Sequence, residues 1–402
     1  MGNTSVLGNE TLDIIDLGLH AYADSFIPEE KLGEPEPIYP LICTLDVKTG
    51  YIRNKVETNA QDRYNLYQYS YTSANSSVSR KHWVGFSSYI DKLLEKRKSN
   101  ILEVGANDGF LSLQLEALKH KVTALDSSNF MTEICLNQGL NALNLAFSLD
   151  NISNSSLEIN SFDCIIANNV FNHANNPLDF LTATKLLLKQ DGFFVFEVPY
   201  WLNLVTSKHF DQIYHEHVSY FTLYSLKYLL AEVGLKIFDF DIVDYHGGSL
   251  RVVAIKNENT SLCNSTKIGY QIERELHLKL FKEETYVKFQ EDIEVERSHF
   301  LSRIHRIISN SQRCPIVGVG AAAKSNTLLT YYGLNNTYID FLTDASEFKI
   351  GKFTPLTRIP IFSDSMLTGI DNVYAIILSW NISDTLKQSI REINRKVNFI
   401  EL

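Results

Sequence analysis

From about residue 80, apolar segments of strand length alternate with segments that have the period of a helix. Residues 101–104 form the first apolar segment, 110–119 follow with a helical pattern, and 122–125 form the next apolar segment. Further strands are expected at 162–167 and 192–198, with a helix at 178–188 between them. Such alternation is typical of a mostly parallel sheet covered by helices. The sequence therefore predicts an α/β domain over residues 81–265.

A second strand–turn–helix pattern begins at Pro315 and predicts a further, smaller Rossmann-like domain, with strands at 338–342 and 373–379. The charged stretch 271–309 has apolar residues at helical spacing, which predicts a long amphipathic helix or a pair of helices. We therefore expect linker helices and a Rossmann-like domain over 266–402. A small N-terminal α+β domain of short strands and loops is expected over 1–80. A chain of 402 residues is long enough for these three parts.

The composition is that of a soluble globular protein, with 45% apolar and 21% charged residues. The net charge of −10 disfavours nonspecific binding to nucleic acid or to an anionic membrane. No apolar run is long enough to cross a bilayer, and the N-terminus lacks the pattern of a signal peptide. We predict a cytoplasmic protein, expected to be a monomer, with no nucleic-acid or membrane partner.

Five cysteines are scattered along the chain without a Cys-x-x-Cys pair. An odd number at such spacings is typical of reduced thiols in a cytoplasmic protein. Because paired thiols and His–Cys clusters are missing, we expect neither a structural zinc nor any other metal.

The segment Glu103-Val-Gly-Ala-Asn-Asp-Gly joins the first strand of the 81–265 domain to its helix. Gly105 and Gly109 permit a tight turn and a close approach of a ligand to the backbone. Asp126 ends the next strand, about 20 residues on, where an acidic side chain can bind ribose hydroxyls. The pattern predicts a cofactor that carries a nucleoside.

Two cofactors fit this order of elements, a nicotinamide dinucleotide and S-adenosylmethionine. The turn lacks the Gly-x-Gly-x-x-Gly pattern that seats a diphosphate, and Asp108 would repel one. Acidic residues suit a cationic sulfonium better, so we favour S-adenosylmethionine. The residues predicted to bind it are Glu103, Gly105, Asn107, Asp108, Gly109, Asp126 and Asn168.

The segment 162–173 ends a strand in polar residues, at the edge where ligands of open α/β sheets gather. Asn168 is expected beside the donor, and His173 beside the acceptor. The alternative for His173 is a histidine at a helix start that bonds only to the backbone.

Four titratable residues, Tyr214, His215, Glu216 and His217, follow one another. In an extended chain Tyr214 and Glu216 would face one way, and the two histidines the other. A metal site and a polar surface between domains are alternatives. Acid–base catalysis fits best, because histidine titrates near neutrality and its neighbours can donate protons or orient it.

Motifs spread over nearly the whole chain resemble one family, the nucleotide-sugar C-methyltransferases that make branched deoxysugars such as mycarose and tetronitrose. The motifs are Leu12-Asp-Ile-Ile-Asp-Leu-Gly, the tyrosine- and serine-rich segment 67–76, Glu103-Val-Gly-Ala-Asn-Asp-Gly, 168–173, Asp211-Gln-Ile-Tyr-His-Glu-His-Val-Ser-Tyr-Phe, His246-Gly-Gly-Ser-Leu-Arg and Gly318-Val-Gly-Ala-Ala-Ala-Lys-Ser-Asn-Thr. The resemblance implies an N-terminal zinc-binding domain, a central donor-binding domain and a C-terminal Rossmann-like domain. The cysteine pairs of that zinc site are missing here, and Leu45-Asp-Val-Lys-Thr-Gly stands at the place of the second.

The same resemblance implies the roles of the acceptor-side residues. His217 corresponds to the family's base, with Tyr214 and Glu216 beside it and His173 across the site. A tyrosine of the N-terminal segment lines the cleft, with Tyr71 as the first match and Tyr69 as the second. Lys324, in a turn that resembles a phosphate-binding turn, would contact the nucleotide sugar, although a purely structural turn is an equal alternative. The other predicted acceptor-binding residues are His246, Arg251 and Asn326.

The reaction implied is carbon methylation of a nucleotide-linked 4-keto-6-deoxysugar at C3. A C–H bond loses its proton readily only beside a carbonyl, and the enolate oxygen needs a hydrogen-bond donor such as Tyr214 or His173. The rival predictions are a sugar O-methyltransferase, a noncatalytic nucleotide-sugar binding protein and a nicotinamide oxidoreductase.

Overall fold

The computed structural model describes residues 10–59, 62–63, 76–259, 263–309 and 314–402. Its largest sheet has the strand order β11-β12-β9-β8-β5-β6-β7. The strands are β5 (Asn100–Val104), β6 (Lys121–Asp126), β7 (Asn141–Asn144), β8 (Phe162–Ile166), β9 (Leu188–Pro199), β11 (Leu235–Val243) and β12 (Ser249–Lys256). From β7 to β9 the neighbours are parallel, while β12 runs antiparallel to both β9 and β11.

Helices cover both faces of this central sheet because alternate strand residues point to opposite sides. Ile101 packs with α2 (Ser77–Leu93) and α3 (Phe110–Ala117), whereas its neighbour Leu102 packs with the core that holds α6 (Pro177–Leu187) and α8 (Leu223–Glu232). The other helices of this part are α4 (Asn129–Asn137), α5 (Leu149–Ser153) and α7 (Trp201–Thr206). The predicted α/β fold is confirmed, with each expected strand and helix of this part in place.

The N-terminal part forms a four-stranded antiparallel sheet in the order β1-β3-β4-β10. Its strands are β1 (Thr11–Ala21), β3 (Ile38–Asp46), β4 (Ile52–Asn54) and β10 (Ser219–Tyr220). The expectation of short strands was wrong for β1 and β3, which have 11 and 9 residues. The two strands are long because they pair with each other from one end to the other, from Thr11 opposite Asp46 to Ala21 opposite Ile38. The domain boundary at residue 80 stays a proposal, since α2 already begins at Ser77.

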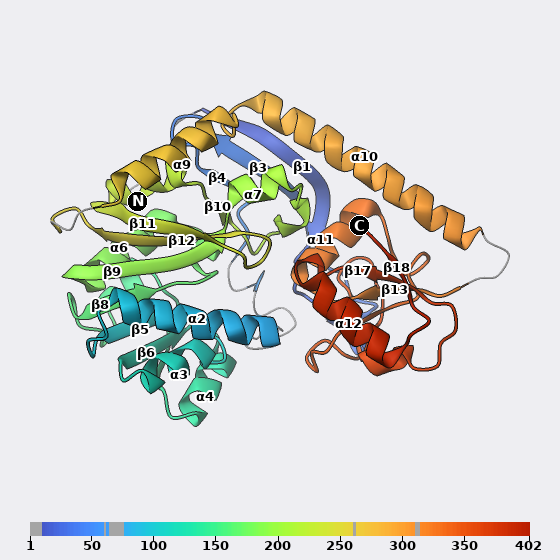
Figure 1. The fold of residues 1–402 in the computed structure, drawn as a ribbon, viewed down its shortest axis with the longest axis horizontal. Coiled ribbons are helices and arrows are strands. Elements are labelled where there is room, and N and C mark those ends of the chain that lie inside the picture. The colour runs from blue at the N-terminus through green and yellow to red at the C-terminus, as the bar shows by residue number, and fades with distance from the viewer. Residues whose placement is uncertain (1–9, 60–61, 64–75, 260–262, 310–313) are drawn as a thin grey trace.

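Two linker helices, α9 (Ser265–His277) and α10 (Glu283–Ile308), lead to the C-terminal sheet, and in Figure 1 α10 runs along the top of the view from α9 towards the C-terminal part. This sheet is parallel throughout, in the order β16-β14-β13-β17-β18. Its elements are β13 (Ile316–Val319), α11 (Ala323–Tyr332), β14 (Phe341–Thr343), β16 (Ile361–Phe362), β17 (Tyr374–Ile377), α12 (Ser383–Ile393) and β18 (Asn398–Ile400).

The strand predicted at 338–342 was placed too early. The backbone N–H groups of Tyr338 and Ile339 donate to the carbonyl of Asn335, so a turn occupies these positions and β14 starts only at Phe341. Ile339 is nevertheless buried in the main core. An apolar residue at a turn therefore gave the same pattern as a strand.

The N-terminal and C-terminal parts are joined directly. β2 (Ile27–Pro28) pairs with β15 (Lys352–Phe353), and Arg358 forms an ion pair with Glu36 at 2.9 Å. In Figure 1 the N-terminal strands lie between the central and C-terminal sheets. The carboxyl edge of the central sheet thus faces residues from both other parts.

Candidate active site

A cavity with a volume of about 1310 Å³ lies where the strand order of the central sheet reverses. In the sheet, β6 lies on one side of β5 and β8 lies on the other. The loops that follow the carboxyl ends of β5 and β8 therefore lead away from each other. Ligands of open α/β sheets bind at such a position. We call this space the switch-point cavity.

The turn after β5 shapes the floor of this cavity. Gly105 has φ +70°, and a Cβ atom there would lie 2.3 Å from the side chain of Val170. Gly109 has φ +76° and is equally closed in by Leu140 and Cys135. Both positions therefore require glycine. Gly105 and Asn107 line the cavity, whereas Gly109 and Asp108 do not.

Asp108 was predicted to face the donor, and its carboxylate instead accepts the N–H of Phe110 at 3.3 Å. It thus caps the first turn of α3, whose early N–H groups have no partner within the helix. The acidic side chains that line the cavity are those of Glu57, Glu103, Asp126 and Asp179.

Glu103, at the end of β5, is 6% exposed and accepts a hydrogen bond from the Ser112 hydroxyl at 2.5 Å. Burial raises the pKa of its carboxyl to about 8. Among the described side chains no cation pairs with Glu103. A positively charged ligand in the cavity would therefore interact favourably with its ionised form.

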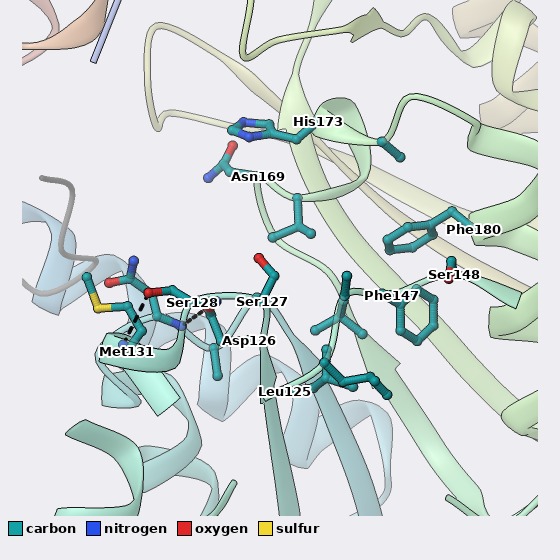
Figure 2. A pocket seen from close by; sticks show the side chains of 18 of the residues that line it. Leu125, Asp126, Ser127, Ser128, Met131, Phe147, Ser148, Asn169, His173 and Phe180 are labelled. Carbon is teal, nitrogen blue, oxygen red and sulfur yellow. Dashed lines mark hydrogen bonds between the residues drawn. The ribbon is translucent and has the colours of Figure 1, made fainter. Parts of the chain in front are cut away.

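Asp126, at the end of β6, accepts the N–H groups of Asn107 at 2.9 Å and Ser128 at 2.8 Å. Burial raises the pKa of this carboxyl, and the two N–H groups oppose that shift. Its carboxylate is thus fixed in orientation at the cavity wall. Figure 2 shows Asp126 and Ser128 on one side of the pocket and Phe147 and Phe180 across from them.

Several lining residues were not predicted. Phe147 and Phe180 form an aromatic pair with ring centroids 4.6 Å apart, and Leu125 and Met131 add apolar surface. Phe147 follows β7, and no strand was predicted there, so no local pattern of the sequence pointed to this residue. Aromatic and aliphatic walls suit a flat heterocycle such as a purine.

The opposite end of this cavity is polar. The Asn168 side-chain oxygen accepts the N–H of Glu197 at 3.0 Å, and its Nδ2 is buried without a partner among the described residues. Asn169 and His173 follow on the same loop, as Figure 2 shows. Burial lowers the pKa of His173 well below its usual value, so the imidazole is neutral.

A second cavity of about 540 Å³ lies between the central sheet and the C-terminal sheet, and we call it the inter-sheet cavity. Its walls include Asp24 from the N-terminal part, His217 from the central part and Lys324 from the C-terminal part. Asn169, His173 and Phe348 line both cavities. The two spaces therefore adjoin at His173.

His217 and Tyr214 form a hydrogen-bonded pair at this cavity, with Tyr214 Oη 2.7 Å from His217 Nε2. The other ring nitrogen, Nδ1, lies 2.9 Å from the carbonyl oxygen of Gln212. A carbonyl only accepts, so Nδ1 carries the proton and Nε2 accepts from the tyrosine hydroxyl. Burial lowers the pKa of His217 to about 3 and keeps the imidazole neutral. His173 faces this pair, with its ring centroid 5.2 Å from that of His217.

Glu216 was expected to orient His217, and this was wrong. Its Oε1 accepts the N–H of Asp24 at 3.0 Å, and its buried Oε2 has no partner among the described residues. The chain turns at 215–216, so neighbouring side chains spread apart rather than alternate. His215 points to the N-terminal sheet and bonds the carbonyl of Pro40.

Two further predicted residues line the inter-sheet cavity. His246 lies on its wall, held in a left-handed conformation with φ +53°. Lys324 begins α11, donates to the side chain of Asn381 and lies 4.6 Å from the Trp380 ring centroid. Burial lowers the pKa of Lys324 to about 8, and the charge of Asp211 opposes this shift.

Arg251 and Asn326 were predicted to bind the acceptor, yet neither lines a cavity. Arg251 forms an ion pair with Glu197 at 2.6 Å and packs on the rings of Phe86 and Tyr89 beneath α2. Asn326 lies in α11 and donates to the carbonyl of Ala23 at 2.6 Å, which joins the C-terminal and N-terminal parts. Tyr69 and Tyr71 lie outside the described residues.

The parts of the chain that the structure describes hold no group of three His, Cys, Asp or Glu side chains arranged for a metal. Cys43, Cys135 and Cys164 are buried free thiols. In the same parts, no helix combines the length and the apolarity that crossing a membrane requires.

Comparisons with known proteins agree with this arrangement. Residues 82–239 match the family model described as a methyltransferase domain, and residues 244–400 match that of the C-methyltransferase C-terminal domain. The chain is 24% identical over 388 residues to the C-methyltransferase NovU of Streptomyces niveus, covering 96% of this chain and 90% of that protein.

Solved structures of low identity are also similar. A Burkholderia thailandensis 1,6-didemethyltoxoflavin-N1-methyltransferase with bound S-adenosylhomocysteine is 17% identical, with a TM-score of 0.39 over 52% of this chain and 96% of that one. The CurJ carbon methyltransferase is 16% identical, with a TM-score of 0.37 over 49% of this chain and 61% of that one.

The sheet order, the nucleoside-type turn and the match over 82–239 define the class: the chain is an S-adenosylmethionine-dependent methyltransferase with a Rossmann-like α/β fold. The match over 244–400 and the likeness to NovU narrow this further. The enzyme is a C-methyltransferase.

Proposed function

We propose that the enzyme methylates a carbon next to the ketone of a nucleotide-linked 4-keto-6-deoxysugar, at C3. The observation that carries this proposal is the Tyr214–His217 pair, whose basic Nε2 atom lies at the cavity that adjoins the switch-point cavity. A carbon becomes a nucleophile by losing a proton, and a neighbouring carbonyl stabilises the charge that results. A base beside the donor site is what this reaction requires.

The switch-point cavity fits S-adenosylmethionine. Among the residues that the structure describes, Glu103 has no cationic partner and Asn168 Nδ2 has no acceptor, and Gly105 lets a ligand approach the backbone. In the proposal, Glu103 and Asn168 hold the charged methionine end, while Asp126 binds the ribose hydroxyls. Gly105 and Asn107 form the floor beneath it. When bound, S-adenosylmethionine supplies an electrophilic methyl group.

The residues of the inter-sheet cavity would hold and activate the acceptor. When the acceptor is bound, the Tyr214 hydroxyl would turn from His217 Nε2 to the substrate oxygen, and the freed Nε2 takes the proton from the carbon. The carbonyl of Gln212 keeps the imidazole in the required tautomer. Tyr214 or His173 donates a hydrogen bond to the enolate oxygen. Lys324, at the start of α11, attracts the diphosphate, and His246 lines the sugar end. The protein then contributes alignment of carbon and methyl group and exclusion of water.

The test uses purified enzyme with 4-keto-6-deoxysugars on different nucleotides, deuterated at the carbon to be methylated. We expect the product to gain one methyl group and to lose that deuterium, as measured by mass spectrometry. A methylated product that retains all the deuterium would indicate methylation of an oxygen and would overturn the proposal. Absence of any methylated nucleotide sugar across the panel would overturn the acceptor class.

A further inference from the structure

Two aromatic residues from distant parts of the chain meet at the mouth of the switch-point cavity. Phe130 is the second residue of α4, in the central part, and Phe348 lies in the loop after β14 of the C-terminal part. Their ring centroids are 6.1 Å apart with the planes at 80°, an edge-to-face arrangement. Such a geometry is attractive for two aromatic rings.

Neither ring is buried by the protein itself. Phe130 is 48% exposed and Phe348 is 42% exposed. Both line the switch-point cavity, and Phe348 also lines the inter-sheet cavity. Two half-exposed rings that meet over a cavity leave apolar surface available to whatever the cavity binds.

The loop that carries Phe348 is fixed to the turn before α11. Asp344 accepts the N–H of Ala321 at 2.7 Å, and the Lys349 ammonium donates to the carbonyl of the same Ala321 at 2.8 Å. Lys349 is itself buried and lies over the ring of Phe26. Phe348 is therefore held by a rigid loop of the C-terminal part and not by the part that forms the donor site.

We propose that Phe348 is a positioning residue for the methyl donor. Through its contact with Phe130, Phe348 closes the switch-point cavity from the C-terminal side. The central part alone then forms an open donor site, and the seated C-terminal part completes it. Because the Phe348 loop is anchored to the turn at Ala321, beside the inter-sheet cavity, occupancy of one cavity favours closure over the other. Binding free energies coupled in this way are reciprocal.

This inference rests on the proposed assignment of the switch-point cavity to the donor, and it does not depend on the acceptor. The test is calorimetric titration of the full-length protein with S-adenosylhomocysteine. Phe348→Ala should weaken binding roughly three- to tenfold, the range expected for loss of one aromatic contact. Phe130→Ala should weaken it similarly, and the double variant should be little worse than either single one. Phe348→Tyr should restore most of the affinity.

The matched control is Phe362→Ala. Phe362 is an aromatic residue of the same part, 37% exposed and in contact with Phe341, and it lines neither cavity. Unchanged affinity in a folded Phe348→Ala protein, or equal weakening in Phe362→Ala, would overturn the inference. If the unsubstituted enzyme itself failed to bind S-adenosylhomocysteine, the assignment of the cavity would be wrong instead.

Discussion

The two cavities of this enzyme are assembled in different ways. The switch-point cavity is built mainly from turns that follow successive parallel strands of one sheet. The inter-sheet cavity combines Asp24, His217 and Lys324, which lie about 100 or more residues apart in the sequence. A site of the first kind is encoded in short segments, whereas the second exists only once three parts of the chain have packed together.

Burial shifts the pKa values of the titratable groups in the two cavities in opposite directions. It raises the pKa of Glu103 to about 8 and lowers that of His217 to about 3, and each shift favours the neutral form. A cationic ligand would restore the charge of the carboxyl. A neutral imidazole, in contrast, is already the form that accepts a proton. The first cavity is thus suited to bind a cation. In the second, His217 would take up a proton only as a negative charge, such as that of an enolate, develops beside it and offsets the cost of burying the imidazolium.

The largest predicted effect is the loss of the base, which should separate the catalytic role of one cavity from the donor-binding role of the other. His217→Asn removes the base and should lower turnover about 10²- to 10⁴-fold, because a positioned base typically contributes that factor. Donor affinity should remain unchanged, since His217 does not line the switch-point cavity. Single-turnover kinetics and calorimetry with S-adenosylhomocysteine measure the two quantities.

His215→Asn is the matched control, because His215 lies two residues away and bonds Pro40 beside the N-terminal sheet. Its turnover should change far less, provided that the protein stays folded. If α-hydrogen exchange with solvent, measured with a demethylated donor analogue, persists in His217→Asn and disappears in His173→Asn, then His173 is the base.

The difference between the cavities also decides what the sequence could predict. The turn that holds Asn107 lies beside Asp126, and short-range patterns were enough to propose both for one site, because strand, turn and strand are consecutive in the sequence. Phe348, in contrast, reaches the same cavity from more than 200 residues away, and no local pattern indicates this. The hydrogen bond between Glu216 and Asp24 likewise depends on packing of the N-terminal part.

The misassignment of Arg251 has a local physical reason. Side chains alternate along β12, and Val253, two residues on, belongs to the core beneath α2. Arg251 therefore shares that face and pairs with Glu197 on the neighbouring strand. The resemblance of the motif His246-Gly-Gly-Ser-Leu-Arg implied a ligand contact, whereas the alternation of side chains along β12 places Arg251 on the face that carries Val253.

The second prediction tests this correction. Arg251→Met should lower the free energy of unfolding by about 3 kcal/mol, because loss of one partner leaves a buried carboxylate poorly paired. The KM values for donor and acceptor should stay the same. Denaturant unfolding and steady-state kinetics provide the measurements, and a raised acceptor KM in a protein of unchanged stability would return Arg251 to the acceptor site.

The third prediction concerns donor affinity. Asp126→Ala should weaken binding of S-adenosylhomocysteine by roughly 1.5–3 kcal/mol, the cost of losing a charged hydrogen-bonding group. Asp126→Asn, which keeps an oxygen for the N–H of Ser128, should lose less. Acceptor binding should be unaffected in both. Calorimetry that finds unchanged donor affinity in folded Asp126→Ala would remove this residue from the donor site.

The smallest predicted effect concerns the charge of Glu103 in the switch-point cavity and how donor affinity depends on pH. In the unliganded enzyme Glu103 has its pKa raised to about 8, so it is mostly protonated at lower pH. A cationic donor favours the ionised carboxylate and lowers this pKa, so binding releases a proton in the pH range just below about 8. The affinity for S-adenosylmethionine should therefore rise with pH and become constant above about pH 8. The contribution of Glu103 to the free energy of unfolding changes with pH in the opposite sense and falls as the pH rises. The reason is that a raised carboxyl pKa stabilises the protein only while the group is protonated.

Glu103→Gln isolates this effect, since glutamine resembles the protonated carboxyl at every pH. At pH 6 the variant and the unsubstituted enzyme should bind S-adenosylmethionine about equally. At pH 8.5 the unsubstituted enzyme should bind roughly tenfold more tightly, as a pKa change of one unit corresponds to about 1.4 kcal/mol. Calorimetry in buffers of different ionisation enthalpy measures both the affinity and the proton release. Parallel pH profiles for the two proteins would show that Glu103 does not respond to the charge of the donor, and the fit of this cavity to a cation would then depend on its other acidic residues, Asp126, Asp179 and Glu57.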